Sequence, residues 1–193
     1  MPGLDVRGIG IDDAPIADWS DSLELSAGKI GEITVCGPVV TRGYHDNPEA
    51  TALAKIAHDG VTRHRMGDVG YLDESGRLWF CGRKSHRVVT VDRTLFTVPC
   101  EAIFNQHPRV FRSALVGLGA RGQQAPVICI QLERGDKNRE PARLERDLLD
   151  LAAAEPLTQD ITRLLFHPGF PVDARHNSKI GRETLTAWVA TQV

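Results

Sequence analysis

The sequence has 193 residues, 41% of them hydrophobic and 25% charged, and its 23 basic and 25 acidic side chains give a formal net charge of −2. This composition is typical of a globular protein of one domain or two small ones, and it excludes a disordered, collagen-like or disulfide-stapled chain. A protein that neutralises many phosphates usually has a clear excess of Lys and Arg, so we expect no nucleic-acid partner. The sequence also lacks a signal-peptide pattern and any transmembrane segment, which predicts a cytoplasmic protein.

The four cysteines stand far apart, in apolar runs such as TVCGPVV and LWFCGR. Isolated thiols in apolar surroundings are typically buried and reduced. A zinc site needs clustered ligands, and neither a C-x-x-C pair nor an H-x-x-x-H pair is present among these cysteines and the nearby histidines. We therefore expect buried thiols at Cys36, Cys81, Cys100 and Cys129, and no metal site.

Residues 1–84 predict a β-rich region. The run IGEITVCGPVV at 30–40 predicts a strand, and PEATALAKIA at 48–57 predicts a helix with Asn47 as its N-cap and Pro48 at its first position. The stretches VTRHRM and DVGYL then lead into the turn DESG, from which RLWFCGR returns as the second arm of a hairpin.

Residues 85–193 predict a mixture of helices and strands, joined to the first region by a short hinge near residues 82–86 and not by a flexible linker. In chain order the patterns predict a strand pair around DRT at 92–94, a short helix at 99–108, strands at 113–119 and 125–133, an amphipathic helix at 139–155, a further helix at 156–166, an extended edge at 166–173 and a terminal helix at 181–190.

Four stretches together resemble one family. They are GEITVCGPVVTRGYHDNPEAT, HRMGDVGYLDESGRLWFCGR, VPCEAIFNQHPRV and NSKIGRETL. In this order and spacing they are similar to motifs of the adenylate-forming enzymes, which include acyl-CoA synthetases, the adenylation domains of peptide synthetases, and luciferases. Enzymes of this family join a carboxylic acid to AMP.

The resemblance implies an α+β fold made of two parts. Residues 1–84 correspond to the C-terminal, β-rich piece of the large AMP-binding domain, and residues 85–193 to the small mixed α/β C-terminal lid domain. The family's phosphate-binding loop and the strand that forms its adenine and acyl pockets would lie upstream of Met1. We therefore expect this segment alone to be inactive, with ATP and Mg²⁺ bound mainly by the missing N-terminal region.

The resemblance also assigns two residues to the nucleotide. Asp68, in M-G-D, matches the aspartate whose carboxylate accepts hydrogen bonds from the ribose hydroxyls of ATP. Arg83, in C-G-R, matches an arginine that reaches the nucleotide. Without the motif, the ordinary interpretations are a turn aspartate that caps the hairpin and a surface arginine at a strand end.

Two further residues receive roles from the lid motifs. Lys179 matches the lysine that the lid inserts between the carboxylate and the α-phosphate, where an ammonium offsets the charge that gathers as one anion attacks another. Ser85 occupies the hinge about which the lid rotates between two working poses. Outside the family context, a lysine in such a polar loop is usually only a solvated surface residue.

The start of the lid departs from the usual pattern. KSHRVVTVDRTLFTVP is about two residues longer than in most members and lacks the glycine that lets the backbone approach a pantetheine arm; Thr94 stands nearest that place. These features resemble the β-lactone synthetases of bacterial long-chain olefin biosynthesis. That branch is thought to adenylate a 2-alkyl-3-hydroxy fatty acid, whose own 3-hydroxyl displaces AMP to give a β-lactone. The implied partners are this small-molecule acyl substrate and other enzymes of the olefin pathway.

Two alternatives remain open at this point. The chain could belong to a long-chain fatty acyl-CoA ligase, whose divergent lid loop still admits CoA. It could also be a lid-like interaction module that catalyses nothing, although such a module has no need of Asp68, Arg83 and Lys179. The base that would take the hydroxyl proton is open as well; His86, near the hinge, is either that base or a surface histidine.

Overall fold

The computed structural model describes residues 3–173 and 179–192. The chain forms two compact units, Met1–Ser85 and His86–Val193. The predicted boundary lies one residue earlier, after residue 84. No helix within the described residues is long and apolar enough to cross a membrane.

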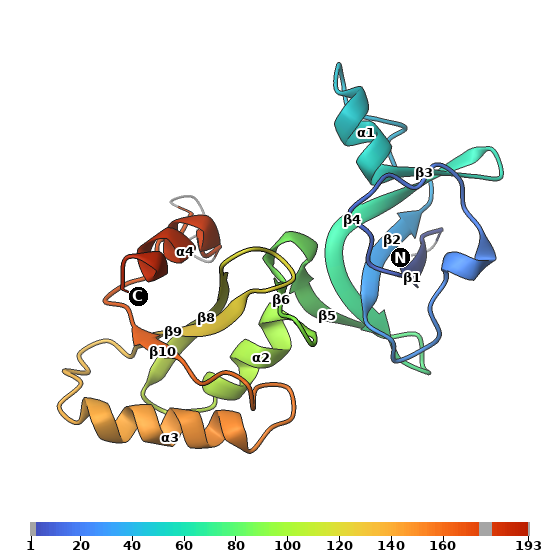
Figure 1. Ribbon diagram of the computed structural model, residues 1–193. Coiled ribbons are helices and arrows are strands. Elements are labelled where there is room, and N and C mark those ends of the chain that lie inside the picture. The colour runs from blue at the N-terminus through green and yellow to red at the C-terminus, as the bar shows by residue number, and fades with distance from the viewer. Residues whose placement is uncertain (1–2, 174–178, 193) are drawn as a thin grey trace. The chain divides into compact units, whose positions relative to one another are not determined.

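The first unit is built on an antiparallel sheet of five strands (Figure 1). Its path runs β1-β2-β4-β3, and β5 pairs with β4. The strands are β1 (Asp5–Ile9), β2 (Gly31–Cys36), β3 (Lys55–His58), β4 (Val61–Leu72) and β5 (Leu78–Arg83), with a 3₁₀ turn at Asp21–Leu23. Strand β4 has 12 residues and contacts the other four, so it organises the unit.

Helix α1 (Pro48–Ala54) begins where the sequence predicts but ends earlier. The side-chain oxygen of Asn47 accepts a hydrogen bond from the Ala50 N–H at 2.9 Å, and Pro48 occupies the first turn. The predicted helix at 48–57 is too long, because Lys55–His58 pairs with β4 as strand β3. Strand pairing thus overrides the helical pattern at this end.

The second unit combines sheets with helices on both faces. In the larger sheet β8 (Val110–Leu118) is antiparallel to β9 (Ala125–Leu132), and β10 (Leu164–Phe166) is parallel to β9. A small sheet pairs β6 (Val88–Val89) with β7 (Thr94–Leu95). The helices are α2 (Thr97–Phe104), α3 (Pro141–Ala153) and α4 (Arg182–Ala190). The α+β fold expected from the sequence is confirmed.

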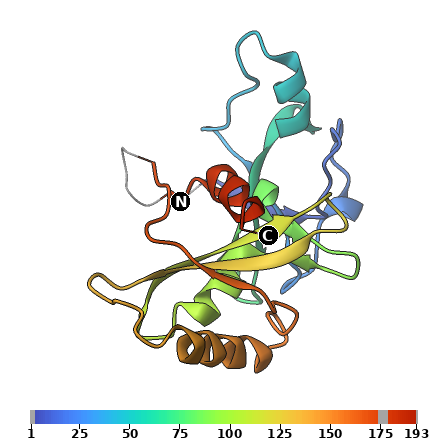
Figure 2. The same cartoon turned by 60° about the vertical axis from the view of Figure 1, so that its left-hand side comes forward.

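Successive side chains of β8 and β9 point to opposite faces of the sheet, so the core of this unit has two layers. On one face Leu115 and Ile128 pack with buried residues of α2 and α3, including Phe104 and Leu148. On the other face lies a second cluster, in which Ala114, Val116, Val127 and Cys129 pack against Leu185 and Val189 of α4. Figure 2 shows α3 and α4 on opposite sides of the sheet.

The predicted helix at 156–166 is wrong. Residues 156–160 form turns, and Leu164–Phe166 is strand β10, with Leu164 opposite Ile128. The run LLF is short and apolar, and such a run fits a buried parallel strand as well as a helix. Here the open edge of β9 decides the outcome, because pairing satisfies the backbone groups of both strands.

We expect Leu148→Ala to lower the free energy of unfolding by about 2–5 kcal/mol, because the substitution opens a cavity in a fully buried layer. Urea denaturation of the variant and the parent measures the difference. Leu157→Ala is the matched control, because Leu157 is 49% exposed, and we expect it to cost at most ~0.5 kcal/mol. Equal costs for the two variants would contradict this description of the core.

Candidate functional site

The structure brings Asp68 and Arg83 together on neighbouring strands. They face each other in the β4–β5 register, and the Arg83 Nε lies 3.2 Å from the Asp68 Oδ1. The Arg83 side chain is 53% exposed and the Asp68 side chain 26% exposed. Asp68 Oδ1 is buried but makes no well-aligned hydrogen bond within the described residues. The pair is therefore loose and open, and its carboxylate keeps acceptor capacity for a ligand.

A glycine with left-handed backbone precedes each member of this pair. Gly67, before Asp68, has φ +67°, and Gly82, before Arg83, has φ +124°. A side chain at either position would strain the backbone. The strand register also shifts between Val69 and Gly70, which bends the hairpin at the pair. The glycines of M-G-D and C-G-R are thus explained by backbone conformation, in addition to the roles that the motifs assign to the Asp68 and Arg83 side chains.

A buried charge network lies beneath the same strands. The Glu32 Oε2 atom accepts hydrogen bonds from Arg65 Nη2 at 2.7 Å and Lys84 Nζ at 3.1 Å. The side chains of Glu32 and Arg65 are each 1% exposed. Arg65 also donates to the carbonyl oxygens of Asp12 and Ala14, and Lys84 to that of Asp12. The network ties β2 and β4 to the N-terminal loop and to Lys84.

Lys84 connects this network to the predicted hinge. It begins the short 3₁₀ turn Lys84–His86, and Ser85 follows it as an exposed residue. Its ammonium group is held by buried Glu32, so the chain is fixed on the first unit up to the residue before Ser85. The hinge role of Ser85 stays a prediction.

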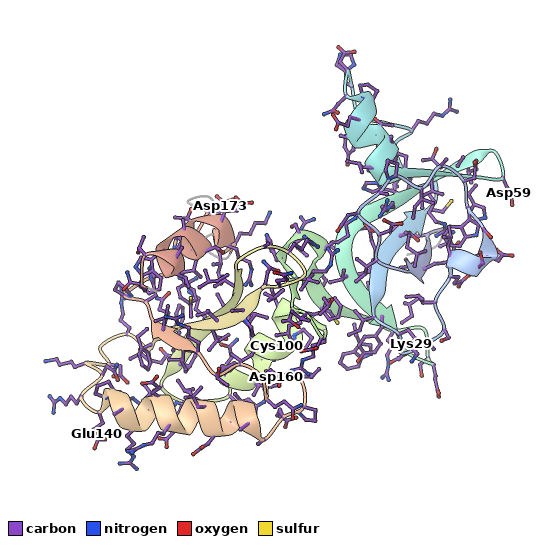
Figure 3. All side chains as sticks on the ribbon, in the orientation of Figure 1. Lys29, Asp59, Cys100, Glu140, Asp160 and Asp173 are labelled. Atoms are coloured by element: carbon purple, nitrogen blue, oxygen red, sulfur yellow. The ribbon has the colours of Figure 1, made fainter. Side chains whose placement is uncertain are left out.

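Lys179 lies in the second unit, with an exposed side chain but a restrained backbone. Its carbonyl oxygen accepts a hydrogen bond from the N–H of Asp173 at 2.9 Å; Asp173 is labelled in Figure 3. The next residue, Ile180, pairs with Val172 through an isolated bridge. The first part of the terminal motif, at 177–178, lies outside the described residues.

A second buried ion pair fixes the start of α4. Arg182, its first residue, donates from Nη2 to Glu101 Oε2 at 3.0 Å and from Nη1 to the Leu115 carbonyl oxygen at 3.0 Å. The Leu115 N–H in turn donates to Glu101 Oε1 at 2.8 Å. Burial raises the pKa of the Glu101 carboxyl, while Arg182 and the Leu115 amide oppose that shift. The pair thus joins α2, β8 and α4.

The segment that lacks a glycine forms a short hairpin. Thr94 in β7 pairs with Val89 in β6, and the Thr90 hydroxyl accepts the N–H of Arg93 at 3.0 Å. The Arg93 guanidinium donates to the Pro156 carbonyl oxygen at 2.6 Å and pairs with Asp160 at 2.7 Å. The hairpin is therefore bound to the loop that follows α3.

The thiols are mostly buried. All four cysteines are free; Cys81, Cys100 and Cys129 are buried and Cys36 is half-buried. Burial raises the pKa of Cys129 to about 12 and also raises the pKa of Cys81, so both stay protonated near neutral pH. Across 3–173 and 179–192, no three His, Cys, Asp or Glu side chains are grouped to hold a metal ion.

The sequence patterns missed the roles of both buried ion networks. Glu32 and Glu101 stood inside quoted motifs without a function, and Arg65 and Arg182 likewise. A usable signal was present at Glu32, since a carboxylate within the apolar strand GEITVC must find a buried cation. Which cation it finds depends on the fold, because Arg65 and Lys84 are far from it in sequence.

No protein-family model matches the chain. It is 53% identical over 193 residues to an olefin beta-lactone synthetase of Xanthomonas campestris pv. campestris, covering 97% of this chain and 35% of that protein. It is 52% identical to the olefin beta-lactone synthetase of Stenotrophomonas maltophilia, covering 98% of this chain and 35% of that protein. A 2-succinylbenzoate–CoA ligase of Geobacillus kaustophilus is 36% identical, over 67% of this chain and 26% of the ligase.

Solved structures share the fold at lower identity. An anthranilate CoA ligase, AuaEII, in complex with anthranoyl-AMP matches with a TM-score of 0.77 at 20% identity, covering 100% of this chain and 35% of that one. The amide bond synthetase McbA from Marinactinospora thermotolerans matches with a TM-score of 0.75 at 24% identity, covering 97% of this chain and 35% of that one. The chain thus spans about a third of the length of its first relatives.

We expect Glu32→Gln to destabilise the first unit by about 3 kcal/mol, because it leaves Arg65 and Lys84 around a neutral amide in the interior. Chemical denaturation followed by tryptophan fluorescence in a Trp188→Phe background reports this unit, because Trp19 and Trp79 both lie in it. Glu24→Gln is the control, since it removes a carboxylate from an exposed pair with Arg7, and we expect a loss below ~1 kcal/mol. A loss no greater for Glu32→Gln than for Glu24→Gln would mean that the buried network does not hold the unit.

Proposed function

Because the chain belongs to the adenylate-forming superfamily, as its motifs predict, we propose that it works as the C-terminal part of an ATP-dependent enzyme that joins a carboxylic acid to AMP. The observation that carries this proposal is the 53% identity across 97% of the chain to a protein named olefin beta-lactone synthetase. The specific reaction that we propose is the closure of a 2-alkyl-3-hydroxy fatty acid to a β-lactone, which the resemblance of the sequence motifs implies.

In this reaction Asp68 and Arg83 hold ATP. The Asp68 carboxylate suits the ribose hydroxyls, since an ionised carboxylate is an acceptor only, and its buried Oδ1 becomes open to them when the half-exposed Arg83 turns away. Arg83 is half exposed beside it and can turn its guanidinium to ribose or phosphate oxygens. Mg²⁺ would be held with the phosphates by residues outside this segment.

Lys179 acts in the chemical step. A substrate carboxylate attacks the α-phosphorus of ATP and pyrophosphate leaves, so negative charge gathers where two anions meet. The Lys179 ammonium is exposed on a backbone that Asp173 and the Ile180 bridge restrain, and a cation placed there stabilises that charge. Ser85 is the proposed hinge that brings the second unit into place.

The second step is the cyclisation. The 3-hydroxyl oxygen of the acyl adenylate attacks the acyl carbonyl carbon, the hydroxyl proton is lost to a base, and AMP leaves with the electrons of the broken C–O bond. An internal nucleophile needs no thiol to be delivered. The β6–β7 hairpin supports this reading: 84–99 contains no glycine, and Arg93 ties the hairpin to the loop after α3.

A second candidate is a fatty acyl-CoA ligase. The match to a 2-succinylbenzoate–CoA ligase over 67% of the chain favours it, because the two reactions share the acyl adenylate. They differ only in the nucleophile that follows.

The test uses the full-length synthetase that carries this segment, a long-chain 2-alkyl-3-hydroxy acid, ATP and Mg²⁺, with and without CoA. We expect proton NMR of the extract to show β-lactone ring protons without CoA. A thioester formed only with CoA would favour the acyl-CoA ligase. Absence of both products and of pyrophosphate release would contradict adenylation itself and favour a non-catalytic module.

Two substitutions separate ATP binding from chemistry. We expect Lys179→Ala to lower kcat for pyrophosphate release at least ~100-fold with little change in Tm, because the side chain is exposed and acts on the transition state. Asp68→Asn should mainly raise the KM for ATP. Lys137→Ala is the matched control, since Lys137 is an exposed lysine on another loop of the same unit. Normal pyrophosphate release by Lys179→Ala would contradict the proposed catalytic role of Lys179.

A further inference from the structure

We propose that the Glu101–Arg182 ion pair is the positioning device for Lys179, so that the rate of adenylation depends on the geometry of this buried pair. This inference rests on the proposed function of Lys179 and adds two residues to it. Neither Glu101 nor Arg182 touches the substrate in this proposal; both act through the backbone that carries the lysine.

The backbone from Lys179 to Arg182 is short and is bonded to the preceding segment at each step. Only two residues, Ile180 and Gly181, separate the lysine from Arg182, and Gly181 donates its N–H to the Pro171 carbonyl oxygen at 2.8 Å. Lys179 itself accepts the N–H of Asp173, and Ile180 packs at the margin of the core beside α4. A displacement of Arg182 would therefore also displace Lys179, because the short backbone between them is restrained by hydrogen bonds.

The Glu101–Arg182 ion pair is largely buried and joins three elements of the second unit. Its side chains are 14% and 11% exposed, and the guanidinium bridges Glu101 on α2 and the Leu115 carbonyl on β8. Gly181, the N-cap of α4, makes no side-chain cap hydrogen bond, so the helix start is held by this fork instead. A bidentate guanidinium fixes distance and direction together, whereas a lysine there would keep only the charge.

The kinetic experiment compares Arg182→Lys, Glu101→Gln and Arg109→Lys in the full-length synthetase. Arg109, just before β8, is the matched control, since it forms a similarly close pair with Asp136, at 2.6 Å and 2.8 Å, away from Leu115 and α4. We expect Arg182→Lys and Glu101→Gln to lower kcat for pyrophosphate release about 10- to 100-fold with the KM for ATP nearly unchanged, as a misplaced catalytic group does. Arg109→Lys should leave kcat unchanged.

A double-mutant cycle identifies the residue through which the pair acts. In the Lys179→Ala background we expect Arg182→Lys to cause no further loss, because the group that it positions is already absent. Full, independent losses in both backgrounds would overturn the proposal, as would equal losses for Arg109→Lys. Thermal unfolding of each variant shows whether activity is measured on folded protein. Glu101→Gln and Arg182→Lys each change one member of the pair, so the result does not depend on a single substitution.

Hydrogen exchange tests, without an activity assay, whether the Glu101–Arg182 pair holds the backbone next to Lys179 in place. We expect Arg182→Lys to speed exchange of the Gly181 amide at least ~10-fold, while the Val110 amide at the start of β8, which donates to the His107 carbonyl oxygen at 2.9 Å, changes less. Unchanged exchange at Gly181 would show that the pair does not hold this backbone, and it would overturn the proposal even in an active enzyme. A wild-type enzyme that releases no pyrophosphate, with Gly181 exchange responding as expected, would instead refute the proposed function and so the catalytic part of this inference.

Discussion

Two inward-facing arginines of β4 dictate how the first unit is assembled. Arg63 is 0% exposed and Arg65 is 3% exposed, and neither can lose its charge in a protein. Each must therefore find fixed partners in the interior. Arg63 pairs with Asp5 and lies with its Cζ 4.5 Å from the Trp19 ring centroid, while Arg65 pairs with Glu32. The N-terminal loop and β2 are thereby drawn onto β4.

The same constraint reaches the residues of the candidate site. Met66, Gly67 and Asp68 follow Arg65 directly, so the buried arginine fixes the strand from which the Asp68 carboxylate projects. Lys84 follows Arg83 and reaches the same Glu32 oxygen as Arg65. A buried network thus sets the positions of an exposed pair, which is free to exchange its own weak contact for a ligand.

Patterns in the sequence predicted most elements and proposed the candidate site residues, and they failed for elements and ion pairs that depend on a partner distant in the chain. The Asn47 cap and the hairpin around Asp73–Gly76 depend on local contacts, and both could be predicted. Strand β10 could not, because its run LLF becomes a strand only against the open edge of β9. The Glu101–Arg182 pair spans 81 residues, a separation that no local pattern covers.

The protein holds its cations in two different ways, and the difference matches the role of each cation. Arg65 and Arg182 are desolvated and paired, which suits groups that must not move, since breaking such a pair leaves an uncompensated charge. Lys179 is exposed, so its ammonium bears no desolvation cost until a substrate displaces the water around it. In the proposed reaction Lys179 approaches two anions only during the chemical step, and such a cation is best kept exposed, on a backbone that, as we propose, the Glu101–Arg182 pair holds in place.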